Sequence, residues 1–424
     1  MNDNCVDNDC VNNEVFDYDF YNRVDVQKLI CQYGSPLYIY DERILRKCCR
    51  EMKNLLQYPW FVANYSIKAN SNMELLKIIR EEGLNADAMS PGEIHVLLKA
   101  GFEPSQIFYV GNNVSMDEMK CAIDNGVLVS VDSLSQLETF GKINKGGRVS
   151  LRFNPGVGAG HHEKVVTAGN NTKFGIDSSF IEEVKQIAEK YSLKVAGVNQ
   201  HIGSLFLDGK PYIEGVKSLL TIAAKFPGLE FIDMGGGFGI PYKKQSQERL
   251  DLSLVSQELE NIIIEWMKDY GREVQIKIEP GRYIVAECGV LLGTVHSIKT
   301  NYGKSYVGTD IGFNVLMRPV MYDSYHEIKF FRNGKLINDG KRGISTVVGN
   351  ICETGDILAK DREIPDDLME GDIMAVLDAG AYGYSMCSNY NLRLKPAEVL
   401  ICEDGSDRLI RRRDTLDDLI AGYR

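Results

Sequence analysis

A lysine at the end of an apolar segment is the first candidate for chemistry in this sequence. The strand-like run Phe61-Val62-Ala63-Asn64-Tyr65-Ser66-Ile67 ends at Lys68, and the small polar turn Ala69-Asn70 follows it. Because burial disfavours the ammonium form, a lysine at the inner end of a buried strand is expected to have a lowered pKa. Such an amine can form a Schiff base with a carbonyl compound. The alternative is a strand-end lysine that points into solvent.

A glycine run and a carboxylate follow two later apolar segments. Gly235-Gly236-Gly237-Phe238-Gly239 comes after one of them, and such a run lets backbone N–H groups approach an anion closely. A dinucleotide fingerprint is a rival interpretation, but Ile240 stands where its last glycine belongs. A tight turn without a ligand is another. Glu279 ends the other segment, and it either contacts a protonated ring nitrogen or pairs with Arg282.

His201 and Ser204 complete a set that suits one cofactor. His201 ends a further apolar segment, and its imidazole is either structural or stacked on an aromatic ring. Ser204 offers a hydroxyl group of the kind that phosphate sites use. A Schiff-base lysine, a phosphate-binding glycine run, a carboxylate and a stacking imidazole together predict pyridoxal 5'-phosphate.

A second set of reactive side chains lies in the C-terminal third of the chain. Cys352 and Glu353 are adjacent in a glycine-bounded loop. The thiol could donate a proton to a carbanion, and a buried structural cysteine is the alternative. Arg318, in Leu316-Met317-Arg318-Pro319, carries a guanidinium suited to bidentate carboxylate binding, and Tyr322 follows it. Tyr382 offers a phenol beside a glycine turn.

Short apolar segments alternate with helix-forming segments through the first two thirds of the chain. We expect β-strands near residues 61–67, 85–89, 107–110, 127–131, 148–153, 194–200, 229–234 and 274–279. This alternation predicts a parallel sheet, and eight units predict an α/β fold with a closed (β/α)₈ barrel. A doubly wound open sheet is the alternative. In a barrel the C-terminal strand ends share one mouth, and the residues there would be Lys68, Asp87, Asp132, Asn154, His201, Gly235 and Glu279.

Capping signatures support the helices between these strands. Four serines precede a glutamate or glutamine at the capping-box spacing: Ser90, Ser115, Ser133 and Ser179. Three glycines stand just past expected helix ends: Gly83, Gly101 and Gly126. These signatures predict where the helices begin and end.

The alternation of strands and helices stops after Gly289. Further β-strands are expected at 290–299, 304–310, 345–349, 373–377, 398–402 and 408–412, with a helix at 414–421. We therefore expect three parts. Residues 1–35 form a lead-in that packs with the β domain, residues 36–285 form the cofactor-binding barrel, and residues 286–424 form a mainly β domain.

The composition is that of an ordinary soluble globular protein of 424 residues. The net charge of −11 argues against nucleic acid or an anionic membrane as partner. No apolar run approaches the roughly 20 residues of a membrane span, and the acidic N-terminus is unlike a signal or transit peptide. The ten cysteines lack metal-type spacings, so we expect no metal site and free thiols in a reducing cytoplasm.

Taken together, the motifs resemble those of the fold-type III pyridoxal-phosphate decarboxylases, and most closely the diaminopimelate decarboxylases. In chain order the motifs occupy residues 65–70, 201–204, 235–239, 279–282, 316–319, 352–356, 378–391 and 408–416. They cover the chain from about Ser35 to the C-terminus. Their set and order are highly specific, although no single motif is.

The resemblance implies a cofactor site and a reaction. The implied pyridoxal 5'-phosphate ligands are Lys68, His201, Ser204, Gly237, Glu279, Gly281, Arg282 and Tyr382. Lys68 would hold the cofactor covalently, His201 would stack on its ring, and Glu279 would contact the ring nitrogen. The implied reaction converts meso-2,6-diaminopimelate to L-lysine and CO₂, the last step of lysine biosynthesis.

The resemblance also implies a substrate site that is shared in a homodimer. The implied substrate-binding residues are Arg282, Arg318, Tyr322, Glu353 and Tyr382. Cys352 would protonate the substrate Cα after loss of CO₂. Cys352 and Glu353 would both come from the partner subunit.

Three related classes of protein are alternatives. Decarboxylases of ornithine, arginine or a carboxypolyamine are the first; their ornithine-type members typically have Cys-Asp where this chain has Cys352-Glu353, and they lack the Leu-Met-Arg-Pro segment. Non-catalytic pyridoxal-phosphate carriers are generally single small barrels. An alanine racemase needs a second base opposite the lysine, where this chain offers a thiol.

Overall fold

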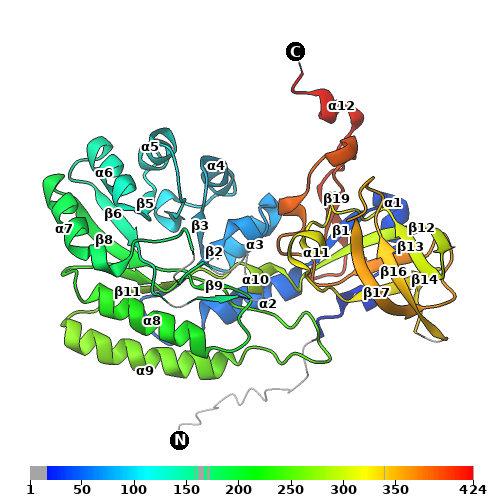
Figure 1. Cartoon of the computed structure of the whole chain (residues 1–424), viewed down its shortest axis with the longest axis horizontal. Coiled ribbons are helices and arrows are strands. Elements are labelled where there is room, and N and C mark those ends of the chain that lie inside the picture. Colours follow the sequence, from blue (N-terminus) through cyan, green and yellow to red (C-terminus); the bar gives the residue numbers. More distant parts are fainter. Residues whose placement is uncertain (1–16, 157, 161–166, 170–171, 339, 424) are drawn as a thin grey trace, which may run out of the picture.

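Two sheets organise the computed structural model of this chain (Figure 1). The structure describes residues 17–156, 158–160, 167–169, 172–338 and 340–423. A closed barrel surrounded by helices occupies one side of Figure 1, and a curled sheet occupies the other side. The short helix α10 (Arg282–Val285) directly precedes the first long strand of the curled sheet, so it links the two parts.

The barrel has eight parallel strands in chain order. They are β2 (Phe61–Ser66), β3 (Asn85–Ala88), β4 (Ile107–Tyr109), β5 (Leu128–Val131), β6 (Arg148–Arg152), β8 (Lys194–Asn199), β10 (Phe231–Asp233) and β11 (Gln275–Ile278). β11 pairs with β2 and closes the barrel. Each strand lies within or beside its expected range, and the (β/α)₈ prediction is confirmed; the open sheet is excluded.

The helices of the barrel lie outside its strands (Figure 1). Their bounds are α2 (Glu42–Lys53), α3 (Met73–Glu81), α4 (Pro91–Lys99), α5 (Met116–Asp124), α6 (Leu134–Ile143), α7 (Ile181–Lys190), α8 (Lys210–Ala223) and α9 (Leu252–Tyr270). Ser90, Ser115 and Ser133 cap α4, α5 and α6 as expected. The expectation for Ser179 is wrong. Ser179 lies inside a 3₁₀ turn, where its own N–H donates to the Asp177 side chain.

The curled sheet has ten strands. They are β1 (Leu37–Asp41), β12 (Gly289–Asn301), β13 (Lys304–Thr309), β14 (Ile328–Arg332), β15 (Lys335–Leu336), β16 (Arg342–Val348), β17 (Ile357–Pro365), β18 (Ile373–Val376), β19 (Ala397–Ile401) and β20 (Asp407–Arg411). The six strands expected after Gly289 are present. β14, β15 and β17 were not expected. Charged side chains interrupt the apolar residues of β14 and β17, and β15 has only two residues. Two further short strands, β7 (Ala159–Gly160) and β9 (Gly203–Ser204), pair near the barrel mouth.

The chain enters the curled sheet before it builds the barrel. β1 runs antiparallel to β12 and parallel to β19. Helix α1 (Val26–Tyr33) precedes it, and Lys28 of this helix pairs with Asp407 of β20 at 3.2 Å. The division of the chain into parts at residues 35 and 285 stays a prediction. The strand pairing shows that β1, although it precedes the barrel in the sequence, belongs to the curled sheet.

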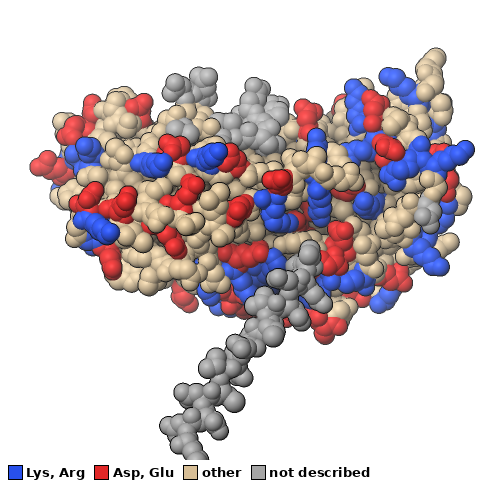
Figure 2. Space-filling model, turned by 90° about the horizontal axis from the view of Figure 1, so that it is seen from below, with Lys and Arg blue, Asp and Glu red and all other residues tan. Residues whose placement is uncertain are grey.

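Charges of both signs are interspersed on the face of the molecule in Figure 2. Lys and Arg side chains alternate there with Asp and Glu side chains over both parts of the chain. The net charge of −11 is therefore not gathered into a single patch on this face. Within the described ranges, no helix combines the length and the apolar character that crossing a membrane requires.

Candidate active site

A cavity of about 180 Å³ lies where the C-terminal strand ends of the barrel meet the curled sheet. Ten of the twelve predicted site residues line it: Lys68, His201, Ser204, Gly237, Glu279, Gly281, Arg282, Arg318, Tyr322 and Tyr382. The first seven follow barrel strands, and the last three come from the C-terminal part of the chain. The structure thus brings together side chains as far apart in the sequence as Lys68 and Tyr382.

Lys68 is held in a turn between the two parts of the chain. It lies in the short 3₁₀ turn Ile67–Ala69, directly after β2. The N–H of Tyr382 donates to the Ala69 carbonyl at 2.8 Å, and the Asn70 side chain donates to the Gly380 carbonyl at 3.0 Å. Both bonds fix the lysine turn against the 378–384 segment, so the curled sheet helps to position the amine.

The expected direction of the Lys68 pKa is wrong. Burial does lower this pKa, as the sequence suggests, but the Tyr382 phenol and two carboxyl groups raise it. The net pKa of Lys68 lies above the ordinary value. The two carboxyl groups belong to Asp87 and Glu279, so without a cofactor the amine is an ammonium ion that compensates their charge.

The carboxyl groups at the mouth are themselves perturbed. Burial raises the pKa of Asp87 to about 7, although the Lys68 charge opposes the rise. The pKa of Glu279 is well above its usual range because of burial and of the charges on Asp233 and Asp87. Glu279 Oε1 is buried and has no hydrogen-bond partner among the described residues. A charged donor placed beside this oxygen would be strongly favoured.

His201 is neutral and has a defined tautomer. The Gly236 N–H donates to His201 Nδ1 at 3.2 Å, so Nδ1 carries no proton and Nε2 carries it. Burial, with the Lys68 and Arg152 charges, holds the pKa of His201 well below its usual range. A neutral imidazole held at its edge presents a ring face that can stack on another aromatic ring.

The glycine run after β10 is required by close packing. Gly235 and Gly237 have φ values of +75° and +113°, which side chains rarely adopt. A Cβ at Gly236 would lie 1.8 Å from the Glu279 carbonyl oxygen, and one at Gly237 would lie 2.6 Å from the Gly203 carbonyl oxygen. The run therefore lets the backbone after β10 pass beside the strand ends of β8 and β11, and it leaves space for an anion.

Arg282 binds neutral partners. Its Nη1 donates to the Tyr242 hydroxyl at 3.0 Å, and its Nη2 donates to Ser204 Oγ at 2.9 Å. Its guanidinium also lies 4.8 Å from the Tyr382 ring centre. The alternative of a Glu279–Arg282 ion pair is wrong: no such pair exists in the described part of the chain.

Arg318 is the largest fully buried side chain, with 1% of its surface exposed. It begins helix α11 (Arg318–Tyr322), and its Nη1 lies 2.7 Å from His326 Nε2. Burial and the neighbouring Arg282 charge lower the pKa of Arg318 to about 10. Among the described residues, neither Arg282 nor Arg318 forms an ion pair with a carboxylate. Two buried guanidinium groups without a counter-ion favour binding of an anion.

Cys352 and Glu353 lie away from this cavity. They occupy an exposed loop between β16 and β17 and do not line the cavity. The Tyr390 hydroxyl donates to Glu353 Oε1 at 2.5 Å, and the Cys352 N–H donates to Asn391 Oδ1 at 3.1 Å. Within one chain the structure does not bring the thiol to the lysine.

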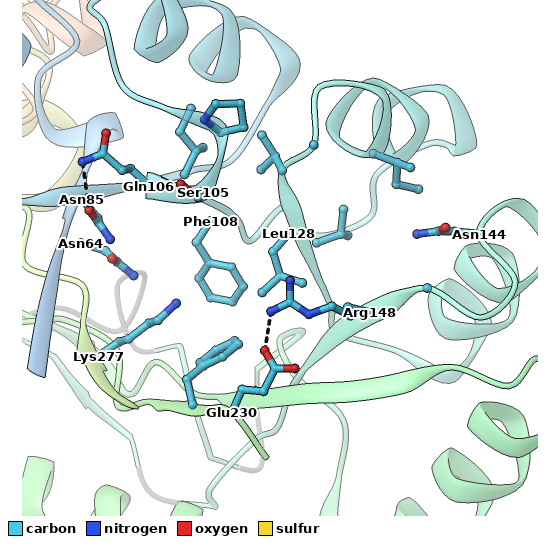
Figure 3. Close-up of a pocket in the computed structure, with 18 of the residues that line it drawn as sticks. Asn64, Asn85, Ser105, Gln106, Phe108, Leu128, Asn144, Arg148, Glu230 and Lys277 are labelled. Carbon is cyan, nitrogen blue, oxygen red and sulfur yellow. Dashed lines mark hydrogen bonds and ion pairs between the residues drawn. The ribbon is translucent and has the colours of Figure 1, made fainter. Parts of the chain in front are cut away.

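A larger cavity, of about 590 Å³, lies at the opposite end of the barrel (Figure 3). The starts of barrel strands line it, and its labelled polar groups are partly paired: Arg148 with Glu230, and Gln106 with Asn85. The Lys277 ammonium lies 4.0 Å from the Phe231 ring centre. None of the predicted site residues lines this cavity, so we assign the chemistry to the smaller one.

The prediction missed several residues that line or support the site, among them Ser66, Thr167 and Phe238, which line the cavity. Arg152 ends β6, is buried, and influences the pKa of Glu279. The sequence predicts Asn154 as the residue at the end of this strand. In the structure the strand ends two residues earlier, at Arg152 itself. Tyr242, His326 and Met386 come from segments without a strand-end signal, and only the folded arrangement brings them to the site.

Within the described ranges, no group of three His, Cys, Asp or Glu side chains has a geometry that could hold a metal ion. The arrangement at the mouth is instead a buried amine, a glycine-lined space, an unpaired carboxylate oxygen and two guanidinium groups. This set can bind an anionic cofactor through its phosphate and an anionic substrate.

Comparisons with known proteins agree with this site. Residues 42–286 match the family model of the pyridoxal-dependent decarboxylases, pyridoxal binding domain. Diaminopimelate decarboxylase of Methanothermobacter thermautotrophicus is 42% identical over 94% of each chain. A structure of diaminopimelate decarboxylase from Helicobacter pylori, complexed with L-lysine, has a TM-score of 0.85 at 33% identity and covers 93% of this chain and 98% of that chain.

A lysine/ornithine decarboxylase from Vibrio vulnificus, complexed with cadaverine, shares the fold with a TM-score of 0.78. At 18% identity, over 92% of this chain and 98% of that one, this likeness extends to the fold alone. The two diaminopimelate decarboxylases described above are each more than 30% identical to this chain over nearly the whole of both chains. The chain therefore belongs to the pyridoxal-dependent decarboxylases and, within them, to the diaminopimelate decarboxylase family.

Proposed function

We propose that this chain decarboxylates meso-2,6-diaminopimelate to L-lysine and CO₂, the last step of lysine biosynthesis, with pyridoxal 5'-phosphate as cofactor. The observation that carries the proposal is the pair of buried guanidinium groups, Arg282 and Arg318, in the same cavity as Lys68. A substrate with a second, distal carboxylate would supply the missing counter-ion.

The residues at the mouth fit the cofactor. Glu279 Oε1 has no hydrogen-bond partner among the described residues, and it suits a ring nitrogen that carries a proton. The space beside Gly237, with Ser204 at its edge, suits a phosphate group, and both residues line the cavity with Lys68. When bound, pyridoxal phosphate supplies an electron-accepting ring that takes up the electrons released as CO₂ leaves.

Each cofactor-binding residue has a defined task. Lys68 would hold the cofactor through Nζ, whose proton is stabilised by Tyr382, Asp87 and Glu279 in the cofactor-free chain. Glu279 would contact the ring nitrogen and stabilise a proton there, which would give its negative charge a partner. The His201 ring, fixed by the Gly236 N–H, would stack on the cofactor ring. Gly281 and Tyr382 line the same cavity. A Cβ at Gly281 would lie 3.4 Å from the Tyr382 hydroxyl.

The substrate's distal end lies near the curled sheet in this proposal. Arg318 binds the distal carboxylate, and Arg282 and Tyr322 contribute from the same wall of the cavity. Ornithine has no distal carboxylate, so it would leave the Arg318 charge buried without a counter-ion. This difference is the basis for selecting diaminopimelate over the other basic amino acids.

The site is completed by a second copy of the chain in this proposal. Cys352 donates the proton that Cα needs after CO₂ departs, and Glu353 binds the distal amino group. Both residues are exposed and lie outside the cavity of their own chain, which suits delivery to the cavity of a partner subunit. A homodimer with two shared sites satisfies both requirements. We also place the enzyme in the cytoplasm, since all eight described cysteines are free thiols.

A substrate comparison tests the proposed function. Protein loaded with pyridoxal phosphate is offered meso-diaminopimelate, L-ornithine, L-arginine and L-lysine, and CO₂ release is measured for each. We expect kcat/KM for meso-diaminopimelate to exceed the others by about a hundredfold or more, because each of them leaves a buried charged site unpaired. Equal turnover of ornithine and meso-diaminopimelate would contradict the assignment.

A further inference from the structure

Arg318 is held by a histidine whose protonation state follows from its contacts. His326 Nδ1 lies 2.8 Å from the Leu377 carbonyl oxygen, which can only accept a hydrogen bond. Its Nε2 lies 2.7 Å from Arg318 Nη1, which can only donate. His326 therefore carries its proton on Nδ1, and Nε2 is a neutral acceptor. Burial and the Arg318 charge hold the pKa of His326 well below its usual range, which agrees with this assignment.

The histidine is itself fixed on several sides. It is 3% exposed, and it lies between α11 and β14. Arg362 Nη1 donates to the His326 carbonyl at 3.0 Å, and the Leu377 carbonyl fixes the ring edge. The Tyr242 ring packs edge-on against the imidazole, with ring centres 5.3 Å apart. The imidazole therefore has a single orientation toward Arg318.

Tyr242 joins the two guanidinium groups of the site. Its hydroxyl accepts a hydrogen bond from Arg282, and its ring centre lies 4.6 Å from the Arg318 guanidinium. All the described hydrogen-bond and ring partners of Arg318 are thus neutral, and Arg282 adds a second positive charge nearby. A carboxylate partner in place of His326 would orient the guanidinium equally well but would cancel its charge.

We propose that His326, with Tyr242, is a positioning residue that orients Arg318 while leaving its charge available, and that it thereby selects substrates with a distal carboxylate. This inference rests on the proposed function and names the basis of its substrate selectivity. His326 acts through Arg318 and not on the reacting Cα. Its removal should therefore affect binding of the distal carboxylate more than the chemical step.

Two substitutions separate orientation from charge. In His326→Gln, the amide oxygen can still accept from Arg318, so KM for meso-diaminopimelate should stay within about threefold of wild type. In His326→Asp, a carboxylate beside Arg318 competes with the substrate, so KM should rise about tenfold or more while kcat changes much less. His95→Asp, on the exposed surface of α4, is the matched control and should behave as wild type.

Inhibition by two matched compounds gives a readout that does not depend on turnover. 2-Aminopimelate and 2-aminoheptanoate have equal chain lengths, and only the first has a distal carboxylate. Wild type and His326→Gln should prefer 2-aminopimelate by about tenfold or more, and His326→Asp should lose this preference. A role confined to folding would weaken both compounds equally. If His326→Asp does not fold, His326→Leu replaces it, because leucine lacks the acceptor and should also lose the preference.

The outcomes distinguish this inference from the proposed function. Wild-type protein that does not release CO₂ from meso-diaminopimelate would overturn the proposed function and this inference with it. Wild-type turnover together with an unchanged inhibitor preference in His326→Asp, or in His326→Leu where that variant is used, would overturn this inference alone. Equal losses of preference in His326→Gln and His326→Asp would also overturn it, because the charge of the partner would then be irrelevant.

Discussion

Charge compensation dominates the site at the scale of single residues. Lys68, Asp87 and Glu279 come from three strand ends. The two carboxyl groups raise the pKa of Lys68, and the Lys68 charge opposes the rise in the pKa of each carboxyl group. The sequence correctly located the lysine and Glu279 at a common mouth. The predicted direction of the Lys68 pKa shift is wrong, because that prediction considered burial and left out the neighbouring carboxyl groups. The direction depends on distances between strands, which no local motif contains.

Asp87 gives the cofactor-free protein a pH-dependent stability. Its pKa is about 7 in the folded chain and about 3.8 as a free side chain, so the folded state binds the proton more tightly. The free energy of unfolding therefore falls as pH rises from about 4 through about 7. Lys68 does not contribute in this window, since its raised pKa places its titration above the window.

We expect the Asp87→Asn substitution to remove this part of the pH dependence. The unfolding midpoint of the variant, relative to wild type, should increase from pH 5 to pH 8, because the neutral amide has no proton to lose. Thermal unfolding of cofactor-free protein across this range measures it. A difference between the two proteins that stays constant with pH would contradict the raised pKa.

At the scale of elements, the strand ends and the segments that follow them build the site. Alternating apolar segments were sufficient to predict all eight barrel strands and the closed barrel. The curled sheet was predicted less completely, because charged residues in β14 and β17 mask the strand pattern. The position of Arg318 beside Arg282 also could not be predicted. It depends on how the curled sheet packs on the barrel, and pairs such as Tyr382 with Ala69 fix that packing.

The glycine run after β10 leads to a prediction about cofactor affinity. In Gly236→Ala, the new Cβ would lie 1.8 Å from the Glu279 carbonyl oxygen, so the loop or the end of β11 must move. We expect a loss of about 1–3 kcal/mol of stability from overpacking, and weaker binding of pyridoxal phosphate. Thermal unfolding and cofactor titration measure both effects.

A matched control for this substitution is Gly422→Ala, where a Cβ would meet no atom within 4 Å. This variant should retain the wild-type unfolding midpoint and cofactor affinity. Equal cofactor affinity in Gly236→Ala and wild type would show that the run has no part in holding the cofactor.

At the scale of the whole molecule, one chain does not bring all the residues of the proposed site together. The cavity holds the amine, the glycine run and the guanidinium groups, whereas the thiol and Glu353 lie in a separate exposed loop. Phe313 and Tyr390 stack beside this loop, with ring centres 5.6 Å apart, and Tyr390 is 44% exposed. An exposed aromatic group next to reactive side chains suits a surface that contacts a second copy.

Mixing a Lys68 variant with a Cys352 variant tests the shared site of the proposed homodimer. Lys68→Ala should lose the absorption band of lysine-bound cofactor and all turnover, and Cys352→Ala should keep the band while kcat falls about 10²–10⁴-fold. When equal amounts are unfolded together and refolded, random pairing makes half of the dimers mixed. Each mixed dimer then has one cavity with both Lys68 and the partner's Cys352. We expect about one quarter of wild-type activity. Because a monomeric site cannot be repaired by mixing, activity no higher than the sum of the separate variants would reject the shared-site arrangement.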